Sequence, residues 1–103
     1  MREDGAHDEW WLATLGRLLV WARLRIRDSG IAEVFDADGK TLVYDSEDIA
    51  RAALMDADFI AFDGLDADDA LQRGLMLVEI VPPNGDDKHS LRARMTQSLG
   101  ARA

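Results

Sequence analysis

Three aspartates and a glycine have spacings that can be compared with a calcium-binding loop. With Gly39 at the sixth loop position, Asp36 and Asp38 take the third and fifth positions and Asp45 the twelfth. Val34 would then stand at the first position, and Asp45 would replace the longer bidentate glutamate. A loop without its first carboxylate binds calcium weakly, whereas "ADG" also suits a hairpin turn. The sequence therefore predicts a turn here, with no metal and no other cofactor.

Other groups that perform catalysis lack a recognisable setting. The chain has no cysteine, which excludes disulfides and thiolate chemistry. His7 and His89 lie near the two ends, where we expect surface residues. No serine stands in a G-x-S-x-G motif and there is no glycine-rich phosphate loop. We therefore expect a protein without enzymatic activity.

Three arginines at alternate positions form the best candidate for a nucleic-acid contact. Arg23, Arg25 and Arg27 follow closely after Trp21. Residues 28–69 nevertheless contain 13 acidic and 2 basic residues, a net charge of −11, and such a block repels phosphate at close range. We expect the arginines to form ion pairs with neighbouring acidic residues, and no direct binding of nucleic acid.

The overall charge of the chain also argues against binding of nucleic acid. The chain has 20 acidic and 12 basic side chains, a formal net charge of −8, which opposes binding to nucleic acid or to anionic membranes. This charge serves either solubility or steering towards a basic partner. The apolar stretch at residues 10–22 contains Arg17 and is too short to cross a bilayer. With no basic start typical of a signal peptide, the expected location is cytoplasmic.

An alternating pattern from about residue 21 to residue 45 predicts a three-stranded antiparallel meander. Its two connections, "DSG" and "ADG", each end in glycine, as a three-residue hairpin loop with a bulge requires. Two such loops set the register: Leu24 faces Val34, Val34 faces Leu42, and Ala32 lies beside Ile26 and Tyr44. Arg25 stands opposite Glu33 in the same register.

Helices are expected before and after the meander. After a tail at residues 1–7, Asp8 would cap a helix from about residue 9 to about residue 19, with Trp11, Leu15, Leu18 and Leu19 on one stripe. Ser46 would cap a helix at about 47–57, and Asp66 one at about 67–73. A fourth strand at about 75–81 ends at Pro82 and Pro83. The expected fold is an α+β domain over residues 1–83, followed by a polar, flexible tail at 84–103.

Two groups of residues are candidates for binding a partner. The first lies on the outer face of the meander, and the second is an acidic group. On the outer face, arginine is mixed with aromatic and β-branched side chains, as in many protein interfaces. The alternative is that the N-terminal helix covers this face with Trp10 and Trp11. The candidates are Arg23, Arg25, Arg27, Glu33, Phe35 and Val43 on the face, and Asp63, Asp66, Asp68 and Asp69 in the acidic group.

Size, charge and the missing catalytic motifs together predict a small acidic binding protein that inhibits a protein partner by occlusion. The most concrete form is an immunity protein or antitoxin that neutralises a bacterial toxin domain with a basic surface, since acidic side chains can fill a cleft built for phosphate. Two alternatives are a phage-type acidic inhibitor of a nucleic-acid-binding machine and a non-enzymatic adaptor or scaffold subunit.

Overall fold

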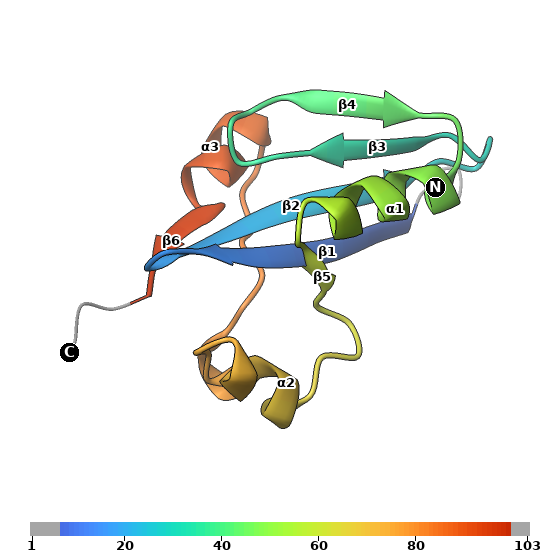
Figure 1. The fold of residues 1–103 in the computed structure, drawn as a ribbon. Coiled ribbons are helices and arrows are strands. Elements are labelled where there is room, and N and C mark those ends of the chain that lie inside the picture. Colours follow the sequence, from blue (N-terminus) through green and yellow to red (C-terminus); the bar gives the residue numbers. More distant parts are fainter. Residues whose placement is uncertain (1–6, 100–103) are drawn as a thin grey trace.

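A six-stranded antiparallel sheet organises the computed structural model, which describes residues 7–99 (Figure 1). The order across the sheet is β4-β3-β2-β1-β5, and β6 pairs with β2. Residues 1–6 and 100–103, where the sequence predicts parts of two tails, lie outside the described residues. In chain order the elements are β1 (His7–Leu15), β2 (Leu18–Ile26), β3 (Ala32–Phe35), β4 (Thr41–Tyr44), α1 (Glu47–Asp56), β5 (Ile60–Ala61), α2 (Ala67–Gln72), the 3₁₀ turn η1 (Leu77–Glu79), α3 (Lys88–Ala93) and β6 (Thr96–Ser98).

The first element is a strand, so the predicted N-terminal helix is wrong. β1 and β2 form a long hairpin whose register runs from His7 opposite Ile26 to Leu15 opposite Leu18. Only Gly16 and Arg17 connect the two strands. Gly16 has φ of 61°, as the first central residue of a type II′ hairpin turn requires. The fold-class prediction of a helix, a meander and one further strand thus undercounts the strands.

The prediction of a helix failed because the middle of the β1–β2 hairpin is covered on both faces, although Leu15 and Leu18 next to its turn are exposed. Trp21 and Ala22 are neighbours on β2 and point to opposite faces, yet they are 0% and 1% exposed. A strand buried on both faces loses the alternation of apolar and polar residues. The resulting continuous apolar run matched a helical spacing equally well.

The register predicted for the meander is confirmed. Leu24 pairs with Val34, Val34 with Leu42, and Ala32 with both Ile26 and Tyr44. The two turn glycines that end "DSG" and "ADG" have φ of 96° and 88°, so each turn contains the left-handed residue that its glycine predicted.

One face of the sheet is covered by α1. Ser46 caps this helix, because its Oγ accepts a hydrogen bond from the Ile49 N–H at 3.2 Å. Ala50 and Leu54 then pack on the sheet around Leu24. The helices at 47–56 and 67–72 lie within one residue of the expected positions.

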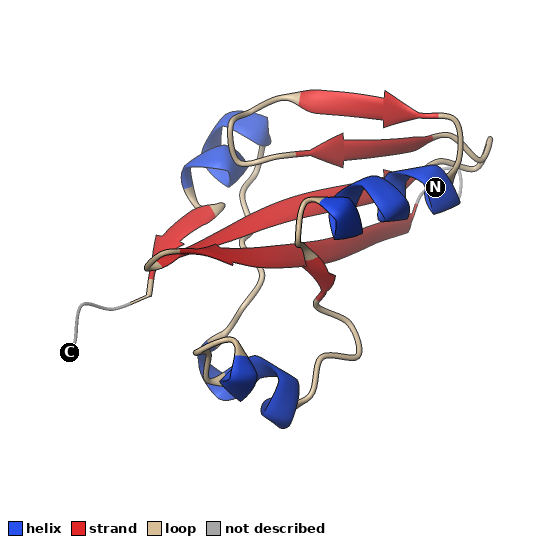
Figure 2. Cartoon of the chain, viewed as in Figure 1, coloured by secondary structure: helices blue, strands red, loops and turns tan. Residues whose placement is uncertain are grey.

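The opposite face is covered by the C-terminal half of the chain, with α2 below the sheet and α3 beside β3 in the view of Figure 2. Its core cluster gathers the sheet residues Trp21 and Phe35 with Leu75, Leu91 and Met95. The backbone N–H of Trp21 donates to the Met95 carbonyl at 2.8 Å, so backbone hydrogen bonds as well as side-chain packing hold this layer on the sheet.

The predicted strand at 75–81 is wrong. The segment contains the turn η1, in which the Ile80 N–H donates to the Leu77 carbonyl at 3.1 Å. Leu75 and Ile80 are buried, whereas Val78 is 87% exposed. A central strand would bury its apolar side chains more evenly, so the segment covers the sheet and does not extend it.

The segment expected to be a polar, flexible tail contains two elements of the fold, α3 and β6. Asp87 caps α3 by accepting a hydrogen bond from the Ser90 N–H at 2.9 Å. Leu91 and Met95, four residues apart, are 5% and 0% exposed. Two well-placed apolar side chains therefore anchor a segment whose composition is otherwise polar. Among residues 7–99, no helix has the length and apolar character that crossing a bilayer demands.

Candidate protein-binding surface

Two of the three arginines at alternate positions, Arg25 in β2 and Arg27 just after it, form ion pairs within the fold. Arg25 donates two hydrogen bonds to the Asp8 carboxylate on β1, at 2.7 and 2.9 Å. Arg27 donates to Glu33 on β3 at 3.0 Å. The hydrogen bond from Arg25 holds the pKa of Asp8 below its usual value, and attraction to nearby arginines adds to it against the effect of burial. The prediction of ion pairs with neighbouring acids is confirmed for Arg25 and Arg27, although the direct partner of Arg25 is Asp8 and not Glu33 opposite it. Arg23 forms no ion pair within residues 7–99, and its buried Nε has no hydrogen-bond partner there.

Phe35 is buried, contrary to the exposed aromatic residue expected on this face. It is 2% exposed, and the guanidinium carbon of Arg23 and Nζ of Lys88 lie 5.5 and 5.1 Å from its ring centroid. Burial lowers the pKa of Arg23, with repulsion from Arg25 contributing. The cover comes from α3 and its surroundings and not from an N-terminal helix. Val43 remains 64% exposed.

The aspartate-rich turn before β4 is stabilised by hydrogen bonds between an aspartate side chain and the backbone of the turn. Asp36 Oδ1 accepts hydrogen bonds from the N–H groups of Asp38 and Lys40, both at 3.0 Å, which is the turn geometry typical of aspartate. Within the part of the chain that the structure describes, no three His, Asp or Glu side chains are grouped as metal ligands. His7 Nε2 lies 3.6 Å from Glu9, and His89 is exposed on α3.

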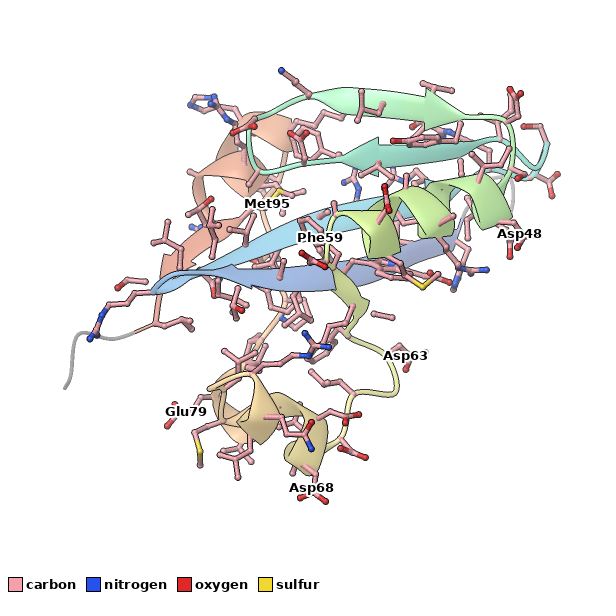
Figure 3. All side chains as sticks on the ribbon, in the orientation of Figure 1. Asp48, Phe59, Asp63, Asp68, Glu79 and Met95 are labelled. Carbon is pink, nitrogen blue, oxygen red and sulfur yellow. The ribbon has the colours of Figure 1, made fainter. Side chains whose placement is uncertain are left out.

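The other predicted group forms an exposed surface that we call the acidic flank: Asp63, Asp66, Asp68 and Asp69. Asp66 caps α2, because its Oδ1 accepts a hydrogen bond from the Asp69 N–H at 2.8 Å. Asp68 and Asp69 then occupy the first turn, where the helix dipole favours negative charge. Figure 3 shows Asp68 at the lower end of the molecule on α2, with Asp63 above it on the connection from β5.

Two hollows lie beside the acidic flank, around β5. One, of about 230 Å³, is lined by Ile60, Ala61, Asp63, Gly64, Leu65, Asp69 and Arg73. The other, of about 280 Å³, is lined by Glu9, Trp10, Trp11, Arg51, Ala61 and Asp63. Asp63 and Ala61 border both. Both linings combine apolar side chains with carboxylates, and each also contains an arginine, Arg73 in the first and Arg51 in the second. Linings with apolar groups and carboxylates suit side chains that combine an apolar stem with a positive head, such as lysine and arginine.

Arg51, one of the two bases in the acidic block, is also neutralised internally. Its guanidinium donates to Glu47 at 2.7 Å and to both carboxylate oxygens of Glu9. Burial alone would raise the pKa of Glu9, but hydrogen bonds from Arg51 and Trp11 outweigh it and lower the pKa. The hydrogen bond to Glu9 is the main reason that the pKa of Arg51 is raised. Sequence reasoning missed this cluster because it placed Glu9 on a helix.

This cluster gives a pH-dependent prediction for Arg51→Gln. Because the pKa of folded Glu9 lies below its ordinary value of 4.5, the ion pair stabilises the fold above that value and is lost as the pH falls through the lower, folded value. We expect a loss of about 1 kcal/mol at neutral pH that shrinks as the pH falls below 4.5. Urea unfolding across this range measures it, with Arg73→Gln as the control. An equal loss at both ends of the range would contradict the assignment.

The residues that the sequence suggested for binding a partner thus divide into two sets. Arg23, Arg25, Arg27, Glu33 and Phe35 are engaged with the fold itself, whereas Val43 and the acidic flank stand exposed. The three arginines carry no large positive surface outward. Comparison of the chain with known protein families, with curated proteins and with solved structures found no match.

Proposed function

We propose that this protein is a small acidic binding protein that inhibits a partner protein by occluding its basic surface. The observation that supports it is the distribution of charge. Arg25, Arg27 and Arg51 are held in ion pairs inside the fold. The four carboxylates of the acidic flank form no ion pair within residues 7–99 and face solvent. The acidic flank therefore gathers four exposed carboxylates near β5 and α2, with Arg73 as a nearby exposed positive charge.

An acidic surface of this kind suits a cleft that evolved to bind phosphate. Carboxylates steer a basic partner into contact and then exclude its anionic substrate. The most concrete version is an immunity protein or antitoxin for a bacterial toxin domain such as a nuclease. The acidic flank would supply charge, and the hollows around β5 would receive arginine or lysine side chains from the toxin.

A growth assay tests the proposed function directly. An immunity gene is expected beside the gene of its toxin, so the product of the gene directly upstream is expressed alone and together with this protein. Expression alone should stop growth of a bacterial host, and co-expression should restore it. Normal growth under both conditions would remove the immunity assignment and favour the adaptor alternative.

Association kinetics with that partner test the role of the acidic flank. Replacing its four aspartates with asparagine should slow association by about tenfold or more at low salt, because steering depends on net charge near the contact. Asparagine at position 66 keeps the cap of α2, so stability should change little. Raising the salt from about 0.1 M to 1 M, which shortens the Debye length from about 10 to 3 Å, should remove most of the difference.

A matched control separates the acidic flank from total charge. Asp28→Asn, Glu79→Gln, Asp86→Asn and Asp87→Asn change the net charge equally at exposed sites elsewhere. The control variant should associate nearly as fast as the wild type. Equal slowing in both variants would show that the acidic flank has no special position in binding.

A further inference from the structure

β4 forms the open edge of the sheet, at the end opposite β5. Within residues 7–99, no strand pairs with its outer side. Edge strands that must stay unpaired usually carry charge, proline or a bulge. Thr41–Tyr44 has none of these, and Leu42 and Val43 are 46% and 64% exposed.

The register shows which backbone groups of β4 point outward. The Asp36 N–H donates to the Lys40 carbonyl at 3.0 Å, which makes these two residues a hydrogen-bonded pair. Bonded and non-bonded pairs alternate along an antiparallel ladder. Leu42 is therefore bonded to Val34, whereas Thr41 and Val43 direct their N–H and carbonyl groups away from β3.

An apolar groove lies beside this edge, between the sheet and α1. Its volume is about 140 Å³, and Leu42, Tyr44, Leu54, Ala57 and Phe59 contribute to its lining, with Asp36 as the one charged lining residue. Phe59, labelled in Figure 3, follows directly after α1. A strand added to β4 would place every second side chain on the face of Leu42 and Tyr44, and so against this groove.

The charges around the groove identify the kind of strand that fits. Asp38 and Lys40 precede β4, and Lys88 donates a hydrogen bond to the Thr41 hydroxyl at 3.0 Å, so this end of the strand carries both signs of charge. The other end is acidic, because Asp45 follows β4 while Asp56 and Asp58 flank Ala57 at the end of α1. A second copy of this chain would bring together two molecules of net charge −8, which disfavours pairing of β4 with β4. A cationic segment is attracted by the same carboxylates.

We propose that β4 accepts an extended segment of a partner protein as an additional strand. Backbone hydrogen bonds to Thr41 and Val43 hold the segment, its alternate aliphatic side chains enter the groove, and a Lys or Arg faces Asp45 at the acidic end of β4. Such strand addition is a common form of peptide recognition. This surface is separate from the acidic flank, and the proposal does not rest on the toxin-neutralising role.

Titration of the isotope-labelled protein with a defined peptide tests the proposal. The probe is an acetylated and amidated Lys-Val-Thr-Val-Thr-Val-Lys peptide, followed by NMR at low salt. We expect saturable shifts at residues 41–44 and along the groove, and at least tenfold weaker binding when both lysines are replaced by glutamate. No saturable shift at residues 41–44, or equal binding of the two peptides, would overturn the proposal. Shifts that depend on protein concentration without peptide would identify a second copy as the occupant and also overturn it.

A pair of variants at one position tests the backbone hydrogen bonds. Val43→Pro removes an outward N–H, and proline is tolerated on edge strands where the N–H faces solvent. This variant should bind the peptide at least tenfold more weakly, whereas Val43→Thr, which keeps the N–H, should bind within twofold of the wild type. N-methylated peptides make the same test on the unaltered protein. Two peptides are used, one methylated at the odd-numbered and the other at the even-numbered backbone nitrogens. Unchanged affinity for both methylated peptides would exclude strand addition.

Discussion

Truncation after Pro83 is expected to abolish cooperative unfolding. The deletion removes Leu91 and Met95, which are 5% and 0% exposed, and uncovers Trp21, which is 0% exposed. Loss of each large core side chain costs about 2–5 kcal/mol, and a domain of this size has only about 5–15 kcal/mol in total. The deletion also removes β6 from β2. Thermal unfolding followed by tryptophan fluorescence and circular dichroism measures the effect.

Truncation after Leu99 is the control for this experiment, because it leaves every described element in place. It should unfold with a midpoint close to that of the full chain. A cooperative transition near the wild-type midpoint in the shorter protein would show that α3 and β6 add no stability to the sheet.

Gly85→Ala is expected to destabilise the protein by about 1–3 kcal/mol, the range observed when atoms are forced into a packed site. A Cβ at this position would lie 2.6 Å from the backbone nitrogen of Leu91. That atom belongs to α3 and cannot rotate aside, so the helix itself must move. Denaturant unfolding measures the change in the free energy of unfolding.

The neighbouring exposed residue supplies the comparison. Asp86→Ala should change the free energy of unfolding by less than about 0.5 kcal/mol, as surface substitutions usually do. Equal stability of Gly85→Ala and the wild type would mean that α3 tolerates displacement and does not pack tightly against residue 85.

The meander was predictable because two local rules agreed there. Its turn glycines and its period of two both fixed the same register, and Leu24, Val34 and Leu42 then followed. The hairpin of β1 and β2 offered no such agreement. The middle of its two strands is covered on both faces, and Gly16 could be taken as the end of a helix as easily as the start of a type II′ turn.

The exposed part of the candidate site was also predictable, whereas its surroundings were not. Asp66 followed by two further acids marks a helix start, so the exposure of the acidic flank could be inferred from local sequence. The contact of Arg51 with Glu9 joins residues 42 positions apart in the chain. Such long-range contacts depend on the order of strands in the sheet. That order could not be predicted once the first strand was taken for a helix.

The position of β6 has a consequence for the order of events during synthesis. Residues 18–20 of β2 pair with β6, which is made more than 70 residues later. On the emerging chain, Trp10 and Phe62 can contact the Trp21 ring early, but Leu91 and Met95 of the same core cluster are made last. The face that bears Trp21 therefore stays partly uncovered until late in translation, and this intermediate is the one that a chaperone would meet. Contacts of such long separation also slow folding, so refolding of the full chain should be slower than closure of the β1–β2 hairpin alone.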